Sequence, residues 1–341
     1  LTQTWAFGTP LARTDTYTYS GTRKHPDTIT EGGRVTSFAF NARDQVTQVN
    51  VTAGGETRNT SVTYTPDGLV ESIETPHTTT GFLYDTKGQV SHIIEALGTS
   101  LERTTTLSNY HASGEPKTVT HPNGLVTTYQ YSPMGMLLSE TSQGQTTSYT
   151  YDLAGLLTEV VNSDGTKDVL EYSSSQALTS ITHKGDDDAT VYTITYTRDN
   201  MNQVIAETIA GAGATALSST LTRNNIGKIQ NLVDAQANQT TLSYNGEGQV
   251  TGQNEPLGRT HTQTYDALNR LTTQVLPNSG QTALTYNADD QVSVAKDARN
   301  NQTTYTYNGF GDMVSMSSPD RGTWSYTYNL GRLISITDPR G

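Results

Sequence analysis

The stretch that decides the fold is Thr264-Tyr265-Asp266-Ala267-Leu268-Asn269-Arg270-Leu271, the clearest copy of a short recurring pattern. The pattern returns at a constant step of 21 residues, which places equivalent tyrosines at Tyr244, Tyr265, Tyr286, Tyr307 and Tyr328. Self-similarity at a fixed short period is the signature of a repeat architecture, in which each copy is one supersecondary unit. The chain is therefore interpreted as an array of repeats before any other fold is considered.

We call the position of these tyrosines in the repeat the slot. The slot can be followed back through the rest of the chain at less regular steps of 20 to 26 residues. It is occupied by Arg223, Arg198, Tyr172, Tyr151, Tyr131, Tyr110, Tyr84, Tyr64, Phe40 and Tyr19. Fifteen copies cover nearly the whole sequence, so little is left for any other kind of domain.

Each repeat is predicted to be a β-hairpin. Tyr149-Thr150-Tyr151 alternates with a period of two and is rich in residues that favour strands. Asp152-Leu153-Ala154-Gly155 then has the composition of a tight turn, because Asp can accept backbone N–H groups and Gly accepts a positive φ.

The copies that lack the turn glycine support this interpretation. The position of the turn glycine is then occupied by Asp44, Asn202, Asn269 or Asp290. Asn and Asp are the other residues that most readily adopt the left-handed region. Gln176 is the one departure from the pattern.

The residues expected to anchor the repeats structurally are the slot aromatics and the turn residues that follow them. They are Tyr64, Gly68, Tyr84, Gly88, Tyr131, Gly135, Tyr151, Asp152, Gly155, Tyr244, Gly248, Tyr265, Asp266, Asn269, Tyr286, Asp290, Tyr307, Gly311, Tyr328 and Gly331.

One feature after the turn leaves two structures open. Leu157 and Val160, or Leu333 and Ile336, lie three residues apart, and a regular strand would place them on opposite faces. Either both faces of the sheet are partly covered, or a β-bulge re-aims one of the side chains.

Composition limits the fold and the function. Apolar residues make up 33% of the chain, and 19 of its residues are tyrosine, so it cannot fill a thick core but can cover one face of a broad sheet. The net charge of −12 argues against a nucleic-acid or anionic-membrane surface. Absence of cysteine excludes disulfides and thiolate metal sites, and no apolar run is long enough for a transmembrane helix.

Two regions are expected along the chain. Residues 1–36 form one or more irregular N-terminal repeats, and residues 37–341 form a continuous array that constitutes one structural domain. The chain starts at Leu1 without Met and ends at Gly341 in a phrase that normally leads into another strand, so we expect a segment of a longer protein.

Candidate sites for chemistry all have simpler structural explanations. Asp186-Asp187-Asp188 offers carboxylates for Ca²⁺ but lacks EF-hand spacing, which favours a solvated hairpin end. Gly211-Ala212-Gly213 lacks the helix and the acidic partner of a nucleotide site, and the seven histidines show no metal-ligand spacing. The Asp or Asn after each slot tyrosine is explained by turn capping, and no nucleophile–base pair stands out. We therefore expect no catalytic, metal or cofactor-binding residue and no cofactor.

The tyrosine-rich face is the one serious candidate for binding. Tyrosine rings stack on sugars and present hydroxyl groups, so a glycan or a peptide would fit across them. The competing explanation is that the rings pack on one another and on Leu and Val side chains.

The phrases Tyr151-Asp152-Leu153-Ala154-Gly155, Tyr265-Asp266-Ala267-Leu268-Asn269-Arg270-Leu271 and Gly331-Arg332-Leu333 resemble the YD repeat of the RHS family. The resemblance covers about 300 residues through many spaced copies. It implies an all-β fold of tandem β-hairpin repeats forming a large curved, spiralling antiparallel sheet, part of a shell or barrel wall. Bacterial RHS proteins and toxin complexes enclose a toxic polypeptide in such a shell, whereas in teneurins it belongs to an adhesion receptor.

The resemblance thus implies a non-catalytic shell segment of an RHS-type polymorphic toxin that encloses a C-terminal toxin or cargo polypeptide. The alternative is an extracellular adhesion module that recognises glycans or a partner protein. Expected partners are the enclosed or adjacent polypeptide, including further RHS repeats, and a glycan in the alternative, without nucleic acid or a membrane span. The expected location is secreted or at the cell surface, in a bacterium.

Overall fold

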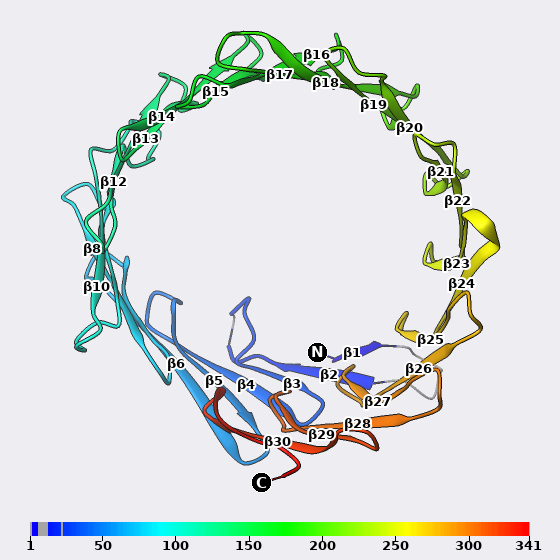
Figure 1. The fold of residues 1–341 in the computed structure, drawn as a ribbon. Coiled ribbons are helices and arrows are strands. Elements are labelled where there is room, and N and C mark those ends of the chain that lie inside the picture. Colours follow the sequence, from blue (N-terminus) through cyan, green and yellow to red (C-terminus); the bar gives the residue numbers. More distant parts are fainter. Residues whose placement is uncertain (1, 6–12, 22, 341) are drawn as a thin grey trace. The chain divides into compact units, whose positions relative to one another are not determined.

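The computed structural model describes residues 2–5, 13–21 and 23–340. In this part of the chain there are 31 β-strands in one antiparallel sheet and a single 3₁₀ turn, η1 (Pro256–Gly258) (Figure 1). The predicted all-β fold of tandem hairpins is therefore confirmed.

The strands follow one another at short intervals. The first sixteen are β1 (Thr2–Trp5), β2 (Arg13–Thr18), β3 (Thr28–Glu31), β4 (Arg34–Phe40), β5 (Val46–Ala53), β6 (Glu56–Tyr64), β7 (Val70–Glu74), β8 (Thr79–Tyr84), β9 (Val90–Glu95), β10 (Arg103–Ser108), β11 (Thr118–Thr120), β12 (Val126–Tyr131), β13 (Leu137–Ser142), β14 (Gln145–Tyr151), β15 (Leu157–Val161) and β16 (Lys167–Tyr172). The others are β17 (Leu178–Lys184), β18 (Thr190–Arg198), β19 (Val204–Gly211), β20 (Leu217–Arg223), β21 (Ile229–Val233), β22 (Gln239–Tyr244), β23 (Val250–Glu255), β24 (Arg259–Tyr265), β25 (Leu271–Val275), β26 (Gln281–Tyr286), β27 (Val292–Lys296), β28 (Gln302–Tyr307), β29 (Met313–Ser318), β30 (Gly322–Asn329) and β31 (Arg332–Thr337).

Residue contacts divide the chain into two compact units. Unit 1 comprises residues 1–81, 95–101 and 260–341, and unit 2 comprises residues 82–94 and 102–259. Unit 1 thus combines the first hairpins of the chain with the last ones, and unit 2 holds the hairpins between them.

Two kinds of turn alternate along the sheet. A tip turn closes each hairpin after its slot residue, as between β14 and β15, and a connection joins that hairpin to the next, as between β15 and β16. Because consecutive strands are antiparallel, the tip turns lie at one end of the strands and the connections at the other.

The tip turn after β14 shows why the sequence folds this way. The carbonyl oxygen of Asp152 accepts the N–H of Gly155 at 3.1 Å, and the N–H of Asp152 donates to the carbonyl oxygen of Leu156 at 2.9 Å. Gly155 has φ +82°. This is a three-residue hairpin loop that ends in a left-handed residue, and that conformation is open to Gly, Asn and Asp.

A β-bulge follows the tip turn after β14 and answers the question that the sequence left open. Tyr151 pairs with Leu157, but Thr150 pairs with Glu159, so Thr158 is an extra residue. Val160 then lies opposite Tyr149, and the bulge places Val160 on the same face as Leu157. Equivalent register shifts occur at Phe40, Tyr64, Tyr131, Tyr172, Arg198, Arg223, Tyr244, Tyr265, Tyr286, Tyr307 and Tyr328.

The sheet has little interior. Among the described residues only two apolar side chains are buried, Ala53 at 3% exposure and Ala177 at 8%. The accessible surface is 20740 Å². A compact monomer of this mass would expose about 13,600 Å², so most side chains are covered on one side only.

The last strand is an exposed apolar edge. β31 pairs with β30, and Leu333, Ile334 and Ile336 are between 43% and 60% exposed. A long unpaired strand edge is a template for pairing with another chain.

We predict that the isolated chain self-associates at high concentration through such edges. Ile334→Lys should weaken this association, because a charged side chain on an edge strand opposes edge-to-edge pairing. Light scattering over a concentration series tests the prediction, with Leu83→Gln on β8 as an exposed control. A strictly monomeric wild-type chain at millimolar concentration would contradict it.

The tip turn after β22 provides a second test. Gly248 has φ +80°, so Gly248→Val places a β-branched residue in the left-handed region and should cost about 1–3 kcal/mol. Asn269→Gly, at φ +65° in the next hairpin, is the matched control, because relief of strain and added unfolded-state entropy nearly cancel. Hydrogen exchange should show lost protection centred on residues 244–250. Equal stability of the two variants would refute the turn assignment.

Candidate functional site

The turn carboxylates and amides act as backbone caps. Oδ1 of Asp152 accepts the N–H groups of Ala154 at 2.8 Å and Leu156 at 2.9 Å. Oδ1 of Asp266 likewise accepts the N–H groups of Leu268 at 2.9 Å and Arg270 at 3.0 Å. The repeated acidic residue after the slot therefore closes the turn by hydrogen bonding, as an Asx turn does.

The predicted turn anchors lie at the left-handed position. Positive φ values are found at Gly68, Gly88, Gly135, Gly155, Gly248, Asn269, Asp290, Gly311 and Gly331. Gln176, which departs from the residue pattern, also adopts φ +62°. Gly331 differs in its loop, because Asn329 pairs with Arg332 and the turn contains only Leu330 and Gly331.

Slot tyrosines such as Tyr172 and Tyr307 lie at the end of a hairpin's first strand and join that hairpin to the preceding one. The hydroxyl of Tyr172 donates to the carbonyl oxygen of Leu157 at 2.8 Å, and that of Tyr307 donates to Val292 at 2.8 Å. Leu157 and Val292 each open the second strand of the preceding hairpin. The acceptor thus lies beside the bulge, where the backbone ladder is disrupted.

The same bond recurs along the chain. Its hydroxyl donors and carbonyl acceptors are Tyr64 with Val46 at 2.7 Å, Tyr244 with Ile229 at 2.5 Å, Tyr286 with Leu271 at 2.7 Å, and Tyr110 with Val90. Burial raises the pKa of Tyr286 and Tyr307, so these phenols stay protonated donors over the whole physiological range.

The arginine at slot 198 performs the tyrosine's role. Nε and Nη2 of Arg198 donate to the carbonyl oxygen of Leu178 at 3.2 and 3.0 Å, and Leu178 opens the preceding second strand. Arg223 is different: Nη1 reaches the carbonyl oxygen of Gly227 at 3.0 Å, but its buried Nε has no hydrogen-bond partner.

The residue after the left-handed position forms a further contact between hairpins. Nε2 of Gln45 donates to the carbonyl oxygen of Gly68 at 2.8 Å, and Nε2 of Gln291 donates to Gly311 at 2.8 Å. Arg270 instead bonds the carboxylate of Asp290 at 2.6 Å and lies over the Tyr286 ring at 4.5 Å. Sequence analysis missed these contacts, although a recurrent Gln or Arg directly after the turn residue is a visible signal.

Within unit 1, three successive tip turns meet three successive connections, and we call this contact the seam. The turn after β26 brings Asp289 against Gly32, where a Cβ would lie 2.8 Å from the carboxylate. The turn after β28 brings Gly309 against Gly54, where a Cβ on Gly309 would lie 2.8 Å from the Gly54 nitrogen. After β30, the carbonyl oxygen of Leu330 lies 3.0 Å from Nε2 of His77.

Arg58 on β6 is the centre of the seam. Its guanidinium lies 3.7 Å over the Phe310 ring and forms an ion pair with Asp312. A Cβ on Gly331 would lie 2.9 Å from Arg58 Nη1. One side chain thus contacts two neighbouring tip turns, and the partly buried ion pair is less screened than an exposed one.

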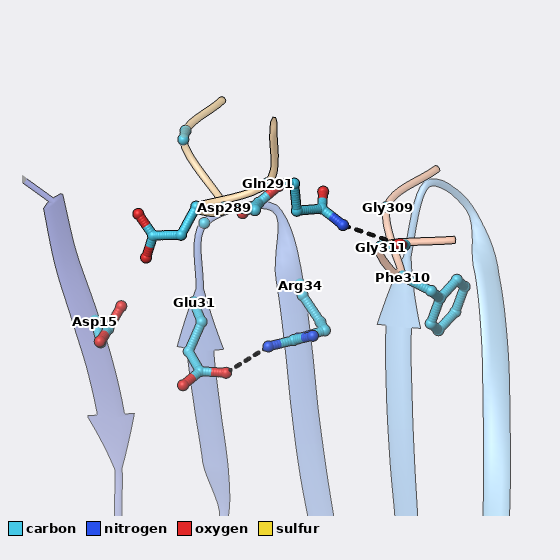
Figure 2. A pocket seen from close by; sticks show the side chains of 11 residues that line it. Asp15, Glu31, Arg34, Asp289, Gln291, Gly309, Phe310 and Gly311 are labelled. Carbon is cyan, nitrogen blue, oxygen red and sulfur yellow. Dashed lines mark hydrogen bonds and ion pairs between the residues drawn. The ribbon is translucent and has the colours of Figure 1, made fainter. Parts of the chain in front are cut away.

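A cavity of about 310 Å³ lies beside the seam, lined by residues from both of its sides. Figure 2 shows the turn that carries Asp289 and Gln291 above Glu31 and Arg34, with Phe310 to one side. Glu31 and Arg34 form an ion pair at 3.0 Å. Asp15, 6% exposed, accepts the Trp5 indole N–H at 2.6 Å. These partners fix the lining groups in place.

The acidic candidates from the sequence lie in the β17–β18 connection. Oδ1 of Asp188 forms ion pairs with Lys167 at 2.9 Å and Lys184 at 3.4 Å. No group of three or more His, Asp or Glu residues with the geometry to hold a metal ion is found among the described residues. Within residues 2–5, 13–21 and 23–340 no helix is long and apolar enough to cross a membrane.

This arrangement of capped hairpins joined by side-chain bonds defines a tandem β-hairpin repeat protein. Residues 244–281 and 286–323 match the RHS Repeat family, and residues 77–204 match the Teneurin YD-shell family. These segments are YD/RHS repeats, which confirms the resemblance to the RHS/YD-repeat family. No match was found among curated proteins.

Solved structures share the fold. The structure of the Photorhabdus luminescens Tc holotoxin pore with a TccC3 mutation matches with a TM-score of 0.61 and 15% identity, over 89% of this chain and 19% of that chain. TcdB2-TccC3 without its hypervariable C-terminal region matches with a TM-score of 0.54 and 14% identity, over 93% of this chain and 22% of that chain. TcdB2-TccC3-Cdc42 matches with a TM-score of 0.53 and 14% identity, over 91% of this chain and 22% of that chain. The chain spans about a fifth of the length of these proteins.

The slot hydroxyl is predicted to contribute to stability. Tyr307→Phe leaves the Val292 carbonyl without its donor and should cost about 1–2 kcal/mol. Tyr305→Phe is the matched control, because it keeps the slot hydroxyl. Urea unfolding measures the loss, and hydrogen exchange should locate it in β27 and β28. If both variants are equally stable, the hydroxyl bond does not hold the hairpins together.

The seam is predicted to weaken in acid. Burial acts to raise the pKa of Asp312, but hydrogen bonds from Asn308 and Arg58, with the charge of Arg58, outweigh it and hold the pKa below its ordinary 3.8. A depressed folded-state pKa contributes stability that is present above pH 3.8 and is lost as the pH falls through the folded value.

Asp312→Asn should therefore lower the free energy of unfolding at pH 7, and the difference from wild type should shrink as the pH falls below 3.8. Urea unfolding at a series of pH values measures this, with the exposed Glu247→Gln as the charge-matched control. A difference that stays constant with pH would show that the Asp312 charge does not stabilise the seam.

Proposed function

We propose that the chain is a non-catalytic segment of an RHS-type shell that walls off a polypeptide cargo. The observation that carries this proposal is the seam, in which successive tip turns close onto successive connections. A sheet one layer thick can act as a wall only if its rows of turns are sealed against one another. The YD/RHS matches support the same role.

The polar groups support a structural role rather than catalysis. Turn carboxylates such as Asp152 and Asp266 accept backbone N–H groups, and Asp188 is paired with two lysines. His183 contacts Asp168 at 2.7 Å and stacks on Tyr192, a cross-strand arrangement that fills the sheet surface. Each of these groups is engaged in holding the array together.

The tyrosine face favours the shell over the adhesion alternative. Slot hydroxyls at Tyr172, Tyr286 and Tyr307 donate to backbone carbonyls. These hydroxyls could not donate to a sugar without leaving the carbonyls unsatisfied. Carbohydrate binding is therefore not part of this proposal.

The proposed partners are an enclosed or adjacent polypeptide and further RHS repeats. The proposed setting is a secreted or surface protein of a bacterium, in keeping with the family resemblance and with the toxin structures that share the fold.

Protease protection tests the proposal. The protein, purified from its native host without denaturant, should retain a second polypeptide that resists protease. Arg58→Ala, which opens the seam, should make that polypeptide sensitive. Arg340→Ala is the matched control, because it removes the same charge from a side chain that is 90% exposed.

Two outcomes would contradict an enclosing role. One is a purified protein with no retained polypeptide. The other is a retained polypeptide that is digested at the same rate in the wild type and in both variants.

A further inference from the structure

Asparagine is followed directly by glycine at three places in the chain, and each pair lies in a turn. The pairs are Asn123-Gly124, Asn245-Gly246 and Asn308-Gly309. Asparagine is a thermolabile residue. It is most reactive before glycine, which has no Cβ to hinder the approach of its backbone nitrogen to the side-chain amide. The surroundings of the three pairs differ, so the fold determines which of them reacts.

The pair at Asn123 closes the connection between β11 and β12. The N–H of Gly124 donates to the carbonyl oxygen of His121 at 2.9 Å. Oδ1 of Asn123 accepts the N–H of Leu125 at 3.0 Å. The glycine nitrogen that would attack the amide is therefore engaged in the bond that closes the turn, and the turn has to open before it can react.

The other two pairs occupy the same place in two tip turns. Asn245 and Asn308 each follow a slot tyrosine and cap the turn. The closing bond of each turn uses the N–H of the left-handed glycine three residues later, at 3.1 Å from Gly248 and 3.0 Å from Gly311. Both side chains also accept the backbone N–H four residues along, at 2.8 and 3.0 Å. The two pairs are thus matched in sequence and in turn geometry.

The seam holds the pair at Asn308 in place. A Cβ on Gly309 would lie 2.8 Å from the nitrogen of Gly54, so the glycine is packed against the facing connection. Nδ2 of Asn308 donates to Oδ2 of Asp312 at 3.0 Å, and that carboxylate is paired with Arg58. The atom that would leave as ammonia is therefore bound to a fixed charge, and its glycine has little room to move.

The pair at Asn245 lies in an open turn of unit 2. Gly246 is exposed, and a Cβ on it would have no neighbour within 4 Å. Nδ2 of Asn245 donates to the uncharged Oε1 of Gln249 at 2.9 Å. A turn with few contacts opens locally at a lower free-energy cost than a packed one.

We propose that Asn245 is a site of spontaneous deamidation in the folded protein, and that the fold protects Asn123 and Asn308. The backbone nitrogen of Gly246 loses its proton to solvent and attacks Cγ of Asn245. The Cγ–Nδ2 bond then breaks, Nδ2 takes up a proton from solvent and leaves as ammonia, and a five-membered succinimide remains. Water opens this ring at Cγ to give aspartate, or at the main-chain carbonyl carbon to give isoaspartate.

The two products have different effects on the tip turn. Aspartate fits, because Asp152 and Asp266 cap equivalent turns by accepting the backbone N–H four residues along. Isoaspartate routes the main chain through Cβ and so adds one atom between Tyr244 and Gly248. The three-residue loop then loses the geometry that places its left-handed residue. One product keeps the turn after β22 and the other disrupts it, and neither effect depends on an enclosed cargo.

Peptide mapping by mass spectrometry tests the proposal on the whole chain, incubated folded in a mildly alkaline buffer. Deamidation at Asn245 should be at least about tenfold faster than at Asn123 or Asn308, because the reaction proceeds through local opening. In urea, where the turns are lost, the three pairs should react at similar rates. Similar rates in the folded chain, or faster reaction at either of the other two pairs, would overturn the proposal.

Two variants test the physical reason, and circular dichroism checks that each is folded. Gly246→Ala should suppress deamidation at Asn245, because the added methyl group hinders ring closure and has free space in the turn. Arg58→Ala, which opens the seam, should accelerate deamidation at Asn308 and leave the rate at Asn245 unchanged. An Asn245 rate that is unaffected by Gly246→Ala, or an Asn308 rate that is unaffected by Arg58→Ala, would contradict the mechanism.

Discussion

The structure depends on the hydrogen bond that slot hydroxyls such as those of Tyr172, Tyr286 and Tyr307 donate to the carbonyl oxygen at the start of the preceding second strand. The bulge disrupts the ladder at this point, and the tyrosine of the next hairpin supplies the missing donor. A buried carbonyl without a partner costs free energy, so a slot hydroxyl that donates to a carbonyl of the preceding hairpin stabilises that hairpin. Arg198 shows that the constraint is on the donor rather than on the aromatic ring, because a guanidinium reaches the equivalent carbonyl.

This constraint explains how the protein remains ordered with almost no buried apolar side chain. Ala53 and Ala177 are the buried apolar residues among those described. Order comes instead from many small contacts of the same kind, each between adjacent hairpins. Turn caps at residues such as Asp152 stabilise the turn of the hairpin, and the bulge determines which face of the sheet the following side chains occupy. The slot donor then determines the spacing to the next hairpin. Stability is then close to a sum of local terms.

The hairpins and their left-handed turns could be predicted from the sequence because the signals are local. Tyr265, Asp266 and Asn269 lie close together in the sequence, and the pattern that they form repeats at a fixed step. The choice between a bulge and a sheet covered on both faces could not be made, because a spacing of three residues fits either. The seam was not predicted at all. Arg58 and Asp312 are 254 residues apart, and neither stands in a motif that indicates the other.

A sheet of one layer also determines how the molecule would respond to mechanical force. Pulling on the two chain ends loads the outermost hairpin first, and its ladder bonds open one after another, as in a zipper. Since each hairpin is held mainly by its neighbour, the array should extend in a series of small, similar steps. Arg58 would interrupt that series, because its contacts tie early hairpins of unit 1 to late ones and must break before either group can peel away.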